Sequence, residues 1–107
     1  NRAVLYAEME TEKAEKDFTR VIELAPELSL AYIGRGNIYL NNKNYDRALS
    51  DFNQAIKLQP DYPEVFYNRG LAFYFKKDFD RAVSDFTKSI ELNPNLVFAY
   101  LNRGICF

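Results

Sequence analysis

The chain of 107 residues contains no histidine, no tryptophan and only one cysteine, Cys106. Without histidine it lacks the commonest general base and metal ligand, which excludes imidazole-based catalysis and most zinc sites. A single cysteine cannot form an internal disulfide. No apolar run approaches the roughly 18 residues that could span a membrane, and no signal peptide is visible. We therefore expect no membrane insertion, and these absences favour a cytoplasmic location.

The chain also lacks an excess of charge of either sign. Its 14 basic residues are interleaved with 15 acidic ones, for a net charge of −1. No basic stripe is offered to a phosphate backbone, so we expect no nucleic-acid binding. The length suits one domain, and a hydrophobic content of 48% with only four glycines and four prolines indicates a globular helical protein.

Three of the glycines recur at a spacing of 34 residues, as Gly36, Gly70 and Gly104. Each follows an arginine and is followed three residues later by an aromatic residue. Further positions recur in phase: Ala14, Ala48 and Ala82; Phe18, Phe52 and Phe86; Pro26, Pro60 and Pro94. A period of this length is typical of stacked helix pairs, which predicts an all-α solenoid of antiparallel pairs.

Within each unit the apolar residues follow two helical stretches of about 13 residues. The expected helices are 1–8, 12–24, 30–42, 45–58, 63–77, 79–92 and 96–107, about seven in all. Asparagines in residues 41–44 tolerate left-handed backbone, and the prolines end the second helix of each pair. The single domain 1–107 is thus divided into a partial repeat 1 (1–26), repeat 2 (27–60), repeat 3 (61–94) and the first helix of repeat 4 (95–107).

A glycine inside a helix costs about 1 kcal/mol relative to alanine, so a recurring one indicates that two helix backbones approach closely. We expect Gly36 to lie opposite Ala48 and Gly70 opposite Ala82. Phe52 and Phe86 would then fill the wider space one helical turn away.

The recurring residues resemble the tetratricopeptide repeat over essentially the whole chain. The match runs through Tyr32, Gly36, Tyr39, Tyr45, Ala48, Phe52, Ala55 and Pro60, and again through Phe66, Gly70, Phe73, Phe79, Ala82, Phe86, Ser89 and Pro94. The resemblance implies a right-handed superhelix that binds other proteins or peptides in its concave groove. The first unit departs from the pattern, with Ala3 for the glycine and one residue fewer, so we expect an irregular turn near Met9 and Glu10.

The resemblance also implies that the first helix of each pair lines this groove. The corresponding residues are Ile33, Asn37, Leu40 and Asn41; Tyr67, Asn68, Leu71, Tyr74 and Phe75; and Phe98, Leu101 and Ile105, with Leu30 and Glu64 beside them. The surface is largely apolar and aromatic, which favours a hydrophobic peptide or an amphipathic helix as ligand. Residues such as Leu71 and Tyr74 could instead pack between neighbouring helices and make no contact with a ligand.

One subfamily, the chaperone adaptors, clamps a C-terminal carboxylate with lysine, asparagine and arginine on this face. Asn37 and Asn68 match the asparagines, but Ile33, Phe98 and Asn102 stand at the three basic positions. A carboxylate would meet two amides and no cation, so we expect no such clamp.

Arginines also recur in phase, at Arg2, Arg35, Arg69 and Arg103, and so do aspartates at Asp17, Asp51 and Asp85. The arginines could grip a phosphorylated or acidic ligand. The alternative, which the matched period of the aspartates favours, is a structural pair within or between units.

The last expected helix is apolar almost all round and has no second helix beside it. Its edge of Tyr100, Gly104 and Phe107 would be covered by further repeats, by another chain or by a helix exchanged between chains. We expect the chain to be a piece of a longer protein and to self-associate through this helix, as a homo-oligomer. Cys106 on this edge is expected to pack rather than to react.

The sequence therefore predicts a protein–protein interaction scaffold and no enzyme, with no catalytic residue, cofactor or metal site. Two alternatives stay open. The chain could be the substrate-recruiting repeat segment of a larger enzyme, or a structural module that assembles with itself.

Overall fold

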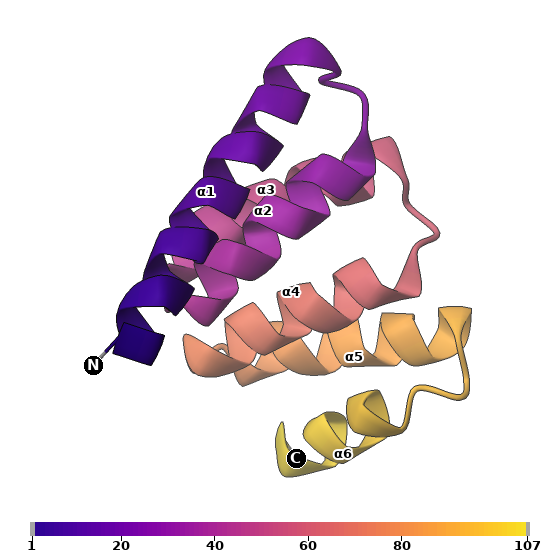
Figure 1. Ribbon diagram of the computed structural model, residues 1–107. Helices are drawn as coiled ribbons and strands as arrows, with labels where there is room; N and C mark the ends of the chain where they lie inside the picture. Colours follow the sequence, from indigo (N-terminus) through magenta and orange to yellow (C-terminus); the bar gives the residue numbers. More distant parts are fainter. Residues whose placement is uncertain (1, 107) are drawn as a thin grey trace.

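The computed structural model describes residues 2–106, with side chains from residue 11 onward, and shows six α-helices there (Figure 1). They are α1 (Arg2–Leu24), α2 (Ser29–Asn41), α3 (Tyr45–Leu58), α4 (Pro63–Phe75), α5 (Phe79–Leu92) and α6 (Val97–Cys106). Consecutive helices pack on one another in a single array, with α1 at one end and α6 at the other. The predicted bounds of α3 and α5 coincide with those found, and the bounds of α2, α4 and α6 agree within two residues at each described end.

The first helix differs from the prediction. The expected break near Met9 and Glu10 is absent, and α1 continues through it, so the described residues form six helices rather than seven. The prediction was wrong because the segment carries no turn residue: Met, Glu and Lys are good helix formers, and no Gly, Pro or Asn interrupts them. Ala3 was expected at the position of the repeat glycine, and its side chain lies outside the described residues.

The turns within the two complete pairs each place a lysine in the left-handed region. Lys43 has φ 64° and Lys77 has φ 65°. After α2, the backbone N–H of Lys43 donates to Leu40 (3.0 Å) and that of Asn44 donates to Tyr39 (2.8 Å). This is the Schellman arrangement that ends many helices, whose left-handed position glycine usually occupies. The left-handed backbone expected within residues 41–44 is found at Lys43.

Glycine at this position should therefore stabilise the protein. Because Lys77 is exposed and its left-handed backbone is strained for a residue with a Cβ, we expect Lys77→Gly to raise the free energy of unfolding by about 1 kcal/mol. Urea denaturation followed by circular dichroism measures the change. Lys88→Gly, in the middle of α5, is the matched control and should lower the same quantity by about 1 kcal/mol. A loss of stability in both variants would contradict the strain argument.

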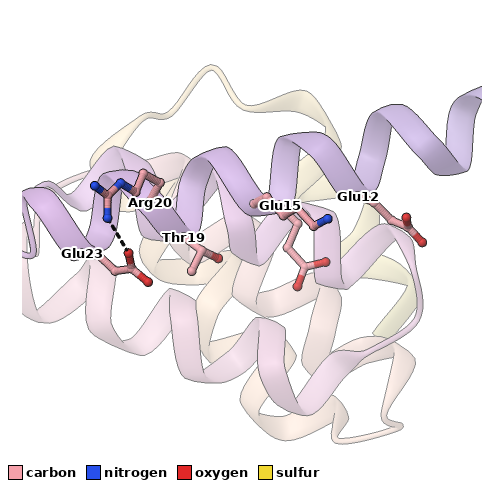
Figure 2. A pocket seen from close by; sticks show the side chains of 6 residues that line it. Glu12, Glu15, Thr19, Arg20 and Glu23 are labelled. Carbon is pink, nitrogen blue, oxygen red and sulfur yellow. Dashed lines mark hydrogen bonds and ion pairs between the residues drawn. The ribbon is translucent and has the colours of Figure 1, made fainter.

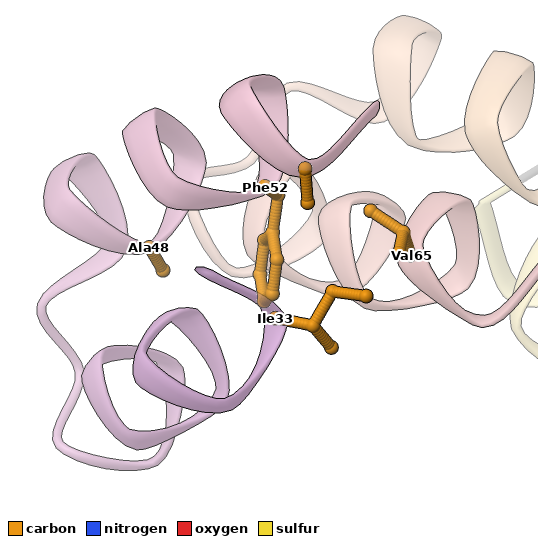
Figure 3. Packing of buried hydrophobic residues seen from close by; sticks show 5 residues of the cluster. Ile33, Ala48, Phe52 and Val65 are labelled. Atoms are coloured by element: carbon orange, nitrogen blue, oxygen red, sulfur yellow. The ribbon is translucent and has the colours of Figure 1, made fainter. Parts of the chain in front are cut away.

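The core cluster lies between the two helices of the second pair and extends to α4 of the third. In the cluster of Figure 3, Phe52 and Val65 are fully buried together with Ala48 and Ala55, and Ile33 completes it from α2. A Cβ on Gly36 would lie 2.7 Å from Cε1 of Phe52, too close for two carbon atoms. The expected partner Ala48 is thus corrected to Phe52: glycine is required because the aromatic ring fills the space directly above its Cα.

The third unit repeats this packing, and the first adds a contact that the periodicity did not indicate. A Cβ on Gly70 would lie 2.7 Å from Cε1 of Phe86, as in the second unit. Gly34, which does not recur, faces α1 instead, where a Cβ would come within 2.4 Å of the Phe18 ring. Gly34 therefore lets α1 approach α2 closely.

Candidate protein-binding surface

The predicted groove begins on α2, where it is largely polar. Asn37 and Leu40 are half-buried and Asn41 is exposed. Ile33, however, is only 7% exposed and belongs to the core cluster, while Leu40 packs against that cluster. Ile33 is therefore a core residue rather than a contact for a ligand, because α1 and α4 both lie against α2.

On α4 the predicted residues form a half-buried aromatic surface, to which Asn68 and Leu71 contribute half-buried side chains. The Tyr67 ring packs on Phe86 with 5.7 Å between centroids, and its hydroxyl accepts a hydrogen bond from Asn102 Nδ2 at 3.0 Å. Partial burial raises the pKa of the Tyr67 hydroxyl above its ordinary value. The phenol therefore stays neutral and fixed between α4 and α6.

The last two aromatic residues of α4, Tyr74 and Phe75, also pack against other aromatic rings. Tyr74 packs edge-on against Phe75 and Phe79, with centroids 5.4 Å and 5.7 Å away. Phe75 also stacks on Tyr45 of the preceding pair at 5.6 Å, although half of its surface stays exposed. These contacts place Phe75 at the turn end of the array, where Lys76 pairs with Asp46 of the same preceding pair.

The most accessible part of the predicted groove lies on α6. Phe98, Leu101 and Ile105 are 68%, 58% and 57% exposed. Their spacing places them on one face of the helix. A shallow hollow at the start of the helix extends this apolar surface toward Tyr67 and is lined by Tyr67, Asn95, Leu96, Val97, Phe98 and Ala99.

Two of the recurring arginines, Arg35 and Arg69, form structural ion pairs. Arg35 donates from Nε and Nη2 to both carboxylate oxygens of Asp51, each at 2.8 Å, and Arg69 binds Asp85 in the same way at 2.8 Å and 2.7 Å. Hydrogen bonding to Asp51 raises the pKa of Arg35 above its usual value. The prediction of a pair within the unit is confirmed for both units, whereas the side chain of Arg2 lies outside the described residues.

Each arginine also makes one contact that the sequence did not reveal. The remaining guanidinium nitrogen Nη1 donates to the preceding helix pair: Arg35 to Thr19 (3.3 Å), Arg69 to Asn53 (2.9 Å) and Arg103 to Thr87 (3.3 Å). Either threonine or asparagine stands two residues after each recurring aspartate. This recurrence is the sequence pattern that could have indicated the contact. The guanidinium groups thus tie neighbouring units together.

A charged hollow lies along one side of α1 (Figure 2), lined by Glu12, Glu15, Lys16, Thr19, Arg20 and Glu23. Several of these side chains already have partners. Arg20 pairs with Glu23 at 3.1 Å, Thr19 accepts from Arg35, and Glu15 accepts from the Tyr39 hydroxyl at 2.9 Å. The hollow therefore offers mixed charge without a concentration of either sign.

The edge predicted to self-associate lies on another face of α6. Tyr100 is exposed, and a Cβ on Gly104 would meet nothing within 4 Å. Phe107, the third residue of that prediction, lies outside the described residues. Partial burial raises the pKa of the Cys106 thiol. The raised pKa keeps the thiol protonated and less nucleophilic at neutral pH.

This arrangement of helix pairs, tied by recurring arginine–aspartate and glycine–phenylalanine contacts, defines a helical-repeat solenoid. The family model described as TPR repeat matches residues 36–77, and the model described as tetratricopeptide repeat matches residues 63–96. The chain belongs to the tetratricopeptide repeat family.

Solved structures of such domains have the same fold. The first TPR of Spaghetti (RPAP3), bound to the HSP90 peptide SRMEEVD, is 23% identical with a TM-score of 0.89 over 94% of this chain and 80% of that one. The second TPR domain of human RPAP3, in complex with the HSP70 peptide SGPTIEEVD, is 28% identical. Its TM-score is 0.86 over 97% of this chain and 87% of that one. The Arabidopsis OM64 TPR domain is 20% identical, with a TM-score of 0.89 over 97% of this chain and 86% of that one.

TPR domains mediate protein–protein interactions by binding peptides of other proteins, and two of these structures hold peptides. Among curated proteins, none is significantly similar to this chain. Within the described residues no helix is both long enough and apolar enough to cross a membrane.

Proposed function

We propose that this chain is an interaction module without catalytic activity of its own, which binds an apolar peptide or an amphipathic helix across α4 and α6. The observation that carries the proposal is the row of exposed apolar side chains on α6, namely Phe98, Leu101 and Ile105. Exposed apolar surface of this continuity usually marks an interaction site.

The geometry of the row suits a helical ligand. Its three residues follow the spacing of one helix face, and the half-buried ring of Tyr67 on α4 lines the same hollow as Phe98. An amphipathic helix presents anchors at the same spacing and buries them in a groove of this kind. The hydrogen bond from Asn102 to Tyr67 holds the two sides of the groove together before a ligand arrives.

The same surface is poorly equipped to bind a carboxylate. None of its predicted residues is lysine or arginine, and Asn102, at one of the basic positions of the chaperone adaptors, directs its amide to Tyr67. The guanidinium groups of Arg35 and Arg69 are bonded to buried aspartates. A terminal carboxylate would therefore lose its hydration without gaining a charged partner.

Binding of three labelled peptides, followed by fluorescence anisotropy, tests the proposal. The two acidic peptides are SRMEEVD and SGPTIEEVD, which the similar structures hold. The third is a helical peptide with leucines at positions i, i+3 and i+7. We expect saturable binding of the leucine peptide alone. Micromolar affinity for either acidic peptide would overturn the proposal, and so would a failure of the leucine peptide to bind.

A variant of α6 locates the site. Leu101→Asp should weaken binding of the leucine peptide at least about tenfold, because it puts a charge into the apolar row. Leu24→Asp is the matched control, since Leu24 is similarly exposed but lies at the end of α1, outside the predicted groove. Equal weakening by both variants would show that binding is not located on α6.

A further inference from the structure

A polar hollow is formed by three consecutive helices in the middle of the array. It is lined by Asn53 of α3, by Arg69 and Phe73 of α4, and by Arg81, Ser84 and Asp85 of α5. Neither α1 nor α6 contributes a residue to it (Figure 1). Helical spacing puts Arg69 and Phe73 on the face of α4 opposite Tyr67 and Leu71, which belong to the predicted groove. The polar hollow is therefore separate from the proposed binding surface.

The carboxylate that lines the polar hollow is already neutralised. Asp85 accepts from Nε and Nη2 of Arg69 at 2.8 Å and 2.7 Å, and its side chain is 5% exposed. Arg69 also donates from Nη1 to Oδ1 of Asn53 at 2.9 Å. Because a guanidinium can only donate, Oδ1 of Asn53 must face Arg69, which leaves the amide Nδ2 free to donate to a ligand.

The other polar groups of the hollow are donors without acceptors. Arg81 has a side chain that is 72% exposed, and its ionic contact, from Nε to Asp78, is as long as 3.5 Å. Its two terminal nitrogens donate to no other described residue, and neither does the hydroxyl of the exposed Ser84. The Phe73 ring supports Arg81 from below, with its centroid 5.7 Å from the guanidinium carbon. Donors from two helices thus face the same space.

Two lysines extend the positive charge of the polar hollow. Lys57 follows Asn53 by one helical turn on α3, and Lys88 follows Ser84 by one turn on α5. Both lysines are exposed, and neither forms an ion pair with another described residue. Since the carboxylate of the hollow is neutralised, this surface favours an anion.

We infer that the polar hollow binds a phosphate group, carried by a phosphorylated serine or threonine of a partner protein. A phosphate has three strong acceptor oxygens, which match the terminal nitrogens of Arg81, the amide of Asn53 and the hydroxyl of Ser84. A carboxylate has two oxygens and would leave one of these donors unused. Because the donors are exposed, a free ion gains little over its hydration, whereas a peptide also contacts α3 and α5 beside the hollow.

The second unit contains the equivalent arrangement with a carboxylate beside it. Arg47 lies over the Tyr39 ring at 5.8 Å, and the Tyr39 hydroxyl donates to Glu15 at 2.9 Å. In the third unit the equivalent positions hold Phe73, which has no hydroxyl, and Leu49 in place of the glutamate. Glu15 repels a phosphate from the second unit. Arg47 is therefore the matched control for the arginine of the polar hollow.

Titration of the isotope-labelled chain with the peptide Ala-Ala-pSer-Ala-Ala, followed by NMR, tests the inference. We expect saturable shifts of the backbone N–H groups of Asn53 and Ser84 and of the Nε–H of Arg81. The same peptide with serine or aspartate in place of phosphoserine should give no saturable shift. Inorganic phosphate should compete for the same site more weakly, because it brings no peptide contacts.

Two variants locate the site. Arg81→Gln should raise the dissociation constant of the phosphopeptide at least about tenfold, because it removes the charged donor, and Arg47→Gln should leave it unchanged. Both arginines are exposed, so helix content by circular dichroism should stay that of wild type. The inference is overturned by an absence of saturable shifts, by shifts confined to α6, or by equal binding of the aspartate peptide or of inorganic phosphate. Equal weakening by the two variants, or weakening by neither, overturns it too.

Discussion

Gly70→Leu is expected to lower the free energy of unfolding by about 3 kcal/mol, the upper end of the usual cost of overpacking a core. Even a Cβ at this position would lie 2.7 Å from Cε1 of Phe86. The ring cannot move aside easily, because Phe86 is completely buried and Tyr67 packs against it. The added side chain must therefore push α4 away from α5.

Gly104→Leu is the matched control, because Gly104 occupies the same repeat position on α6 with nothing within 4 Å of its Cβ. Leucine has the higher helix propensity, so this variant should be as stable as wild type or slightly more stable. Urea denaturation of both variants, at a concentration where the chains are monomeric, measures the difference. Equal losses would mean that glycine is needed for the backbone of the helix and not for the Phe86 ring.

The periodicity of the sequence predicts the helix pairs well where turn chemistry accompanies it. Pro63 begins α4, and Phe79 and Leu92 bound α5 as expected, because proline and the polar turn residues limit where a helix can run. The arginine–aspartate pairs were also predictable, since both partners recur with one period. The continuous α1 was not predicted because the expected break came from the repeat pattern, while the local sequence there contains no glycine, proline or asparagine that would end a helix.

The candidate site shows what a repeat pattern cannot determine. Ile33, Tyr67 and Leu101 all stand three residues before a repeat glycine. Ile33 is nevertheless 7% exposed, Tyr67 is half-buried and Leu101 is 58% exposed. The pattern indicates which face of a helix a residue occupies, but its exposure depends on how many neighbouring helices cover that face. α2 is covered on both sides, whereas among the described residues α6 has neighbouring helices on one side only.

Asp51→Asn is expected to lower the free energy of unfolding by about 3 kcal/mol, the cost of leaving one partner of a buried ion pair without the other. Asp51 accepts from Nε and Nη2 of Arg35, and its side chain is only 6% exposed. Asparagine retains one acceptor oxygen but turns its amide N–H groups toward a guanidinium that can only donate. Arg35 would then keep only its hydrogen bond to Thr19 of α1 and its position over the Tyr39 ring, neither of which offsets its positive charge as a carboxylate does.

An exposed pair provides the comparison that shows whether burial is the cause. Arg20 and Glu23 form an ion pair at 3.1 Å whose side chains are 67% and 59% exposed, so Glu23→Gln should change stability by less than about 0.5 kcal/mol. High salt should abolish that small effect and leave most of the Asp51→Asn effect, because buried charges are screened much less. If Asp51→Asn were as stable as wild type, Arg35 would not depend on its aspartate. The recurring arginines would then have to be reconsidered as a site for an acidic ligand, since a guanidinium that is stable without its internal partner is free to bind an external one.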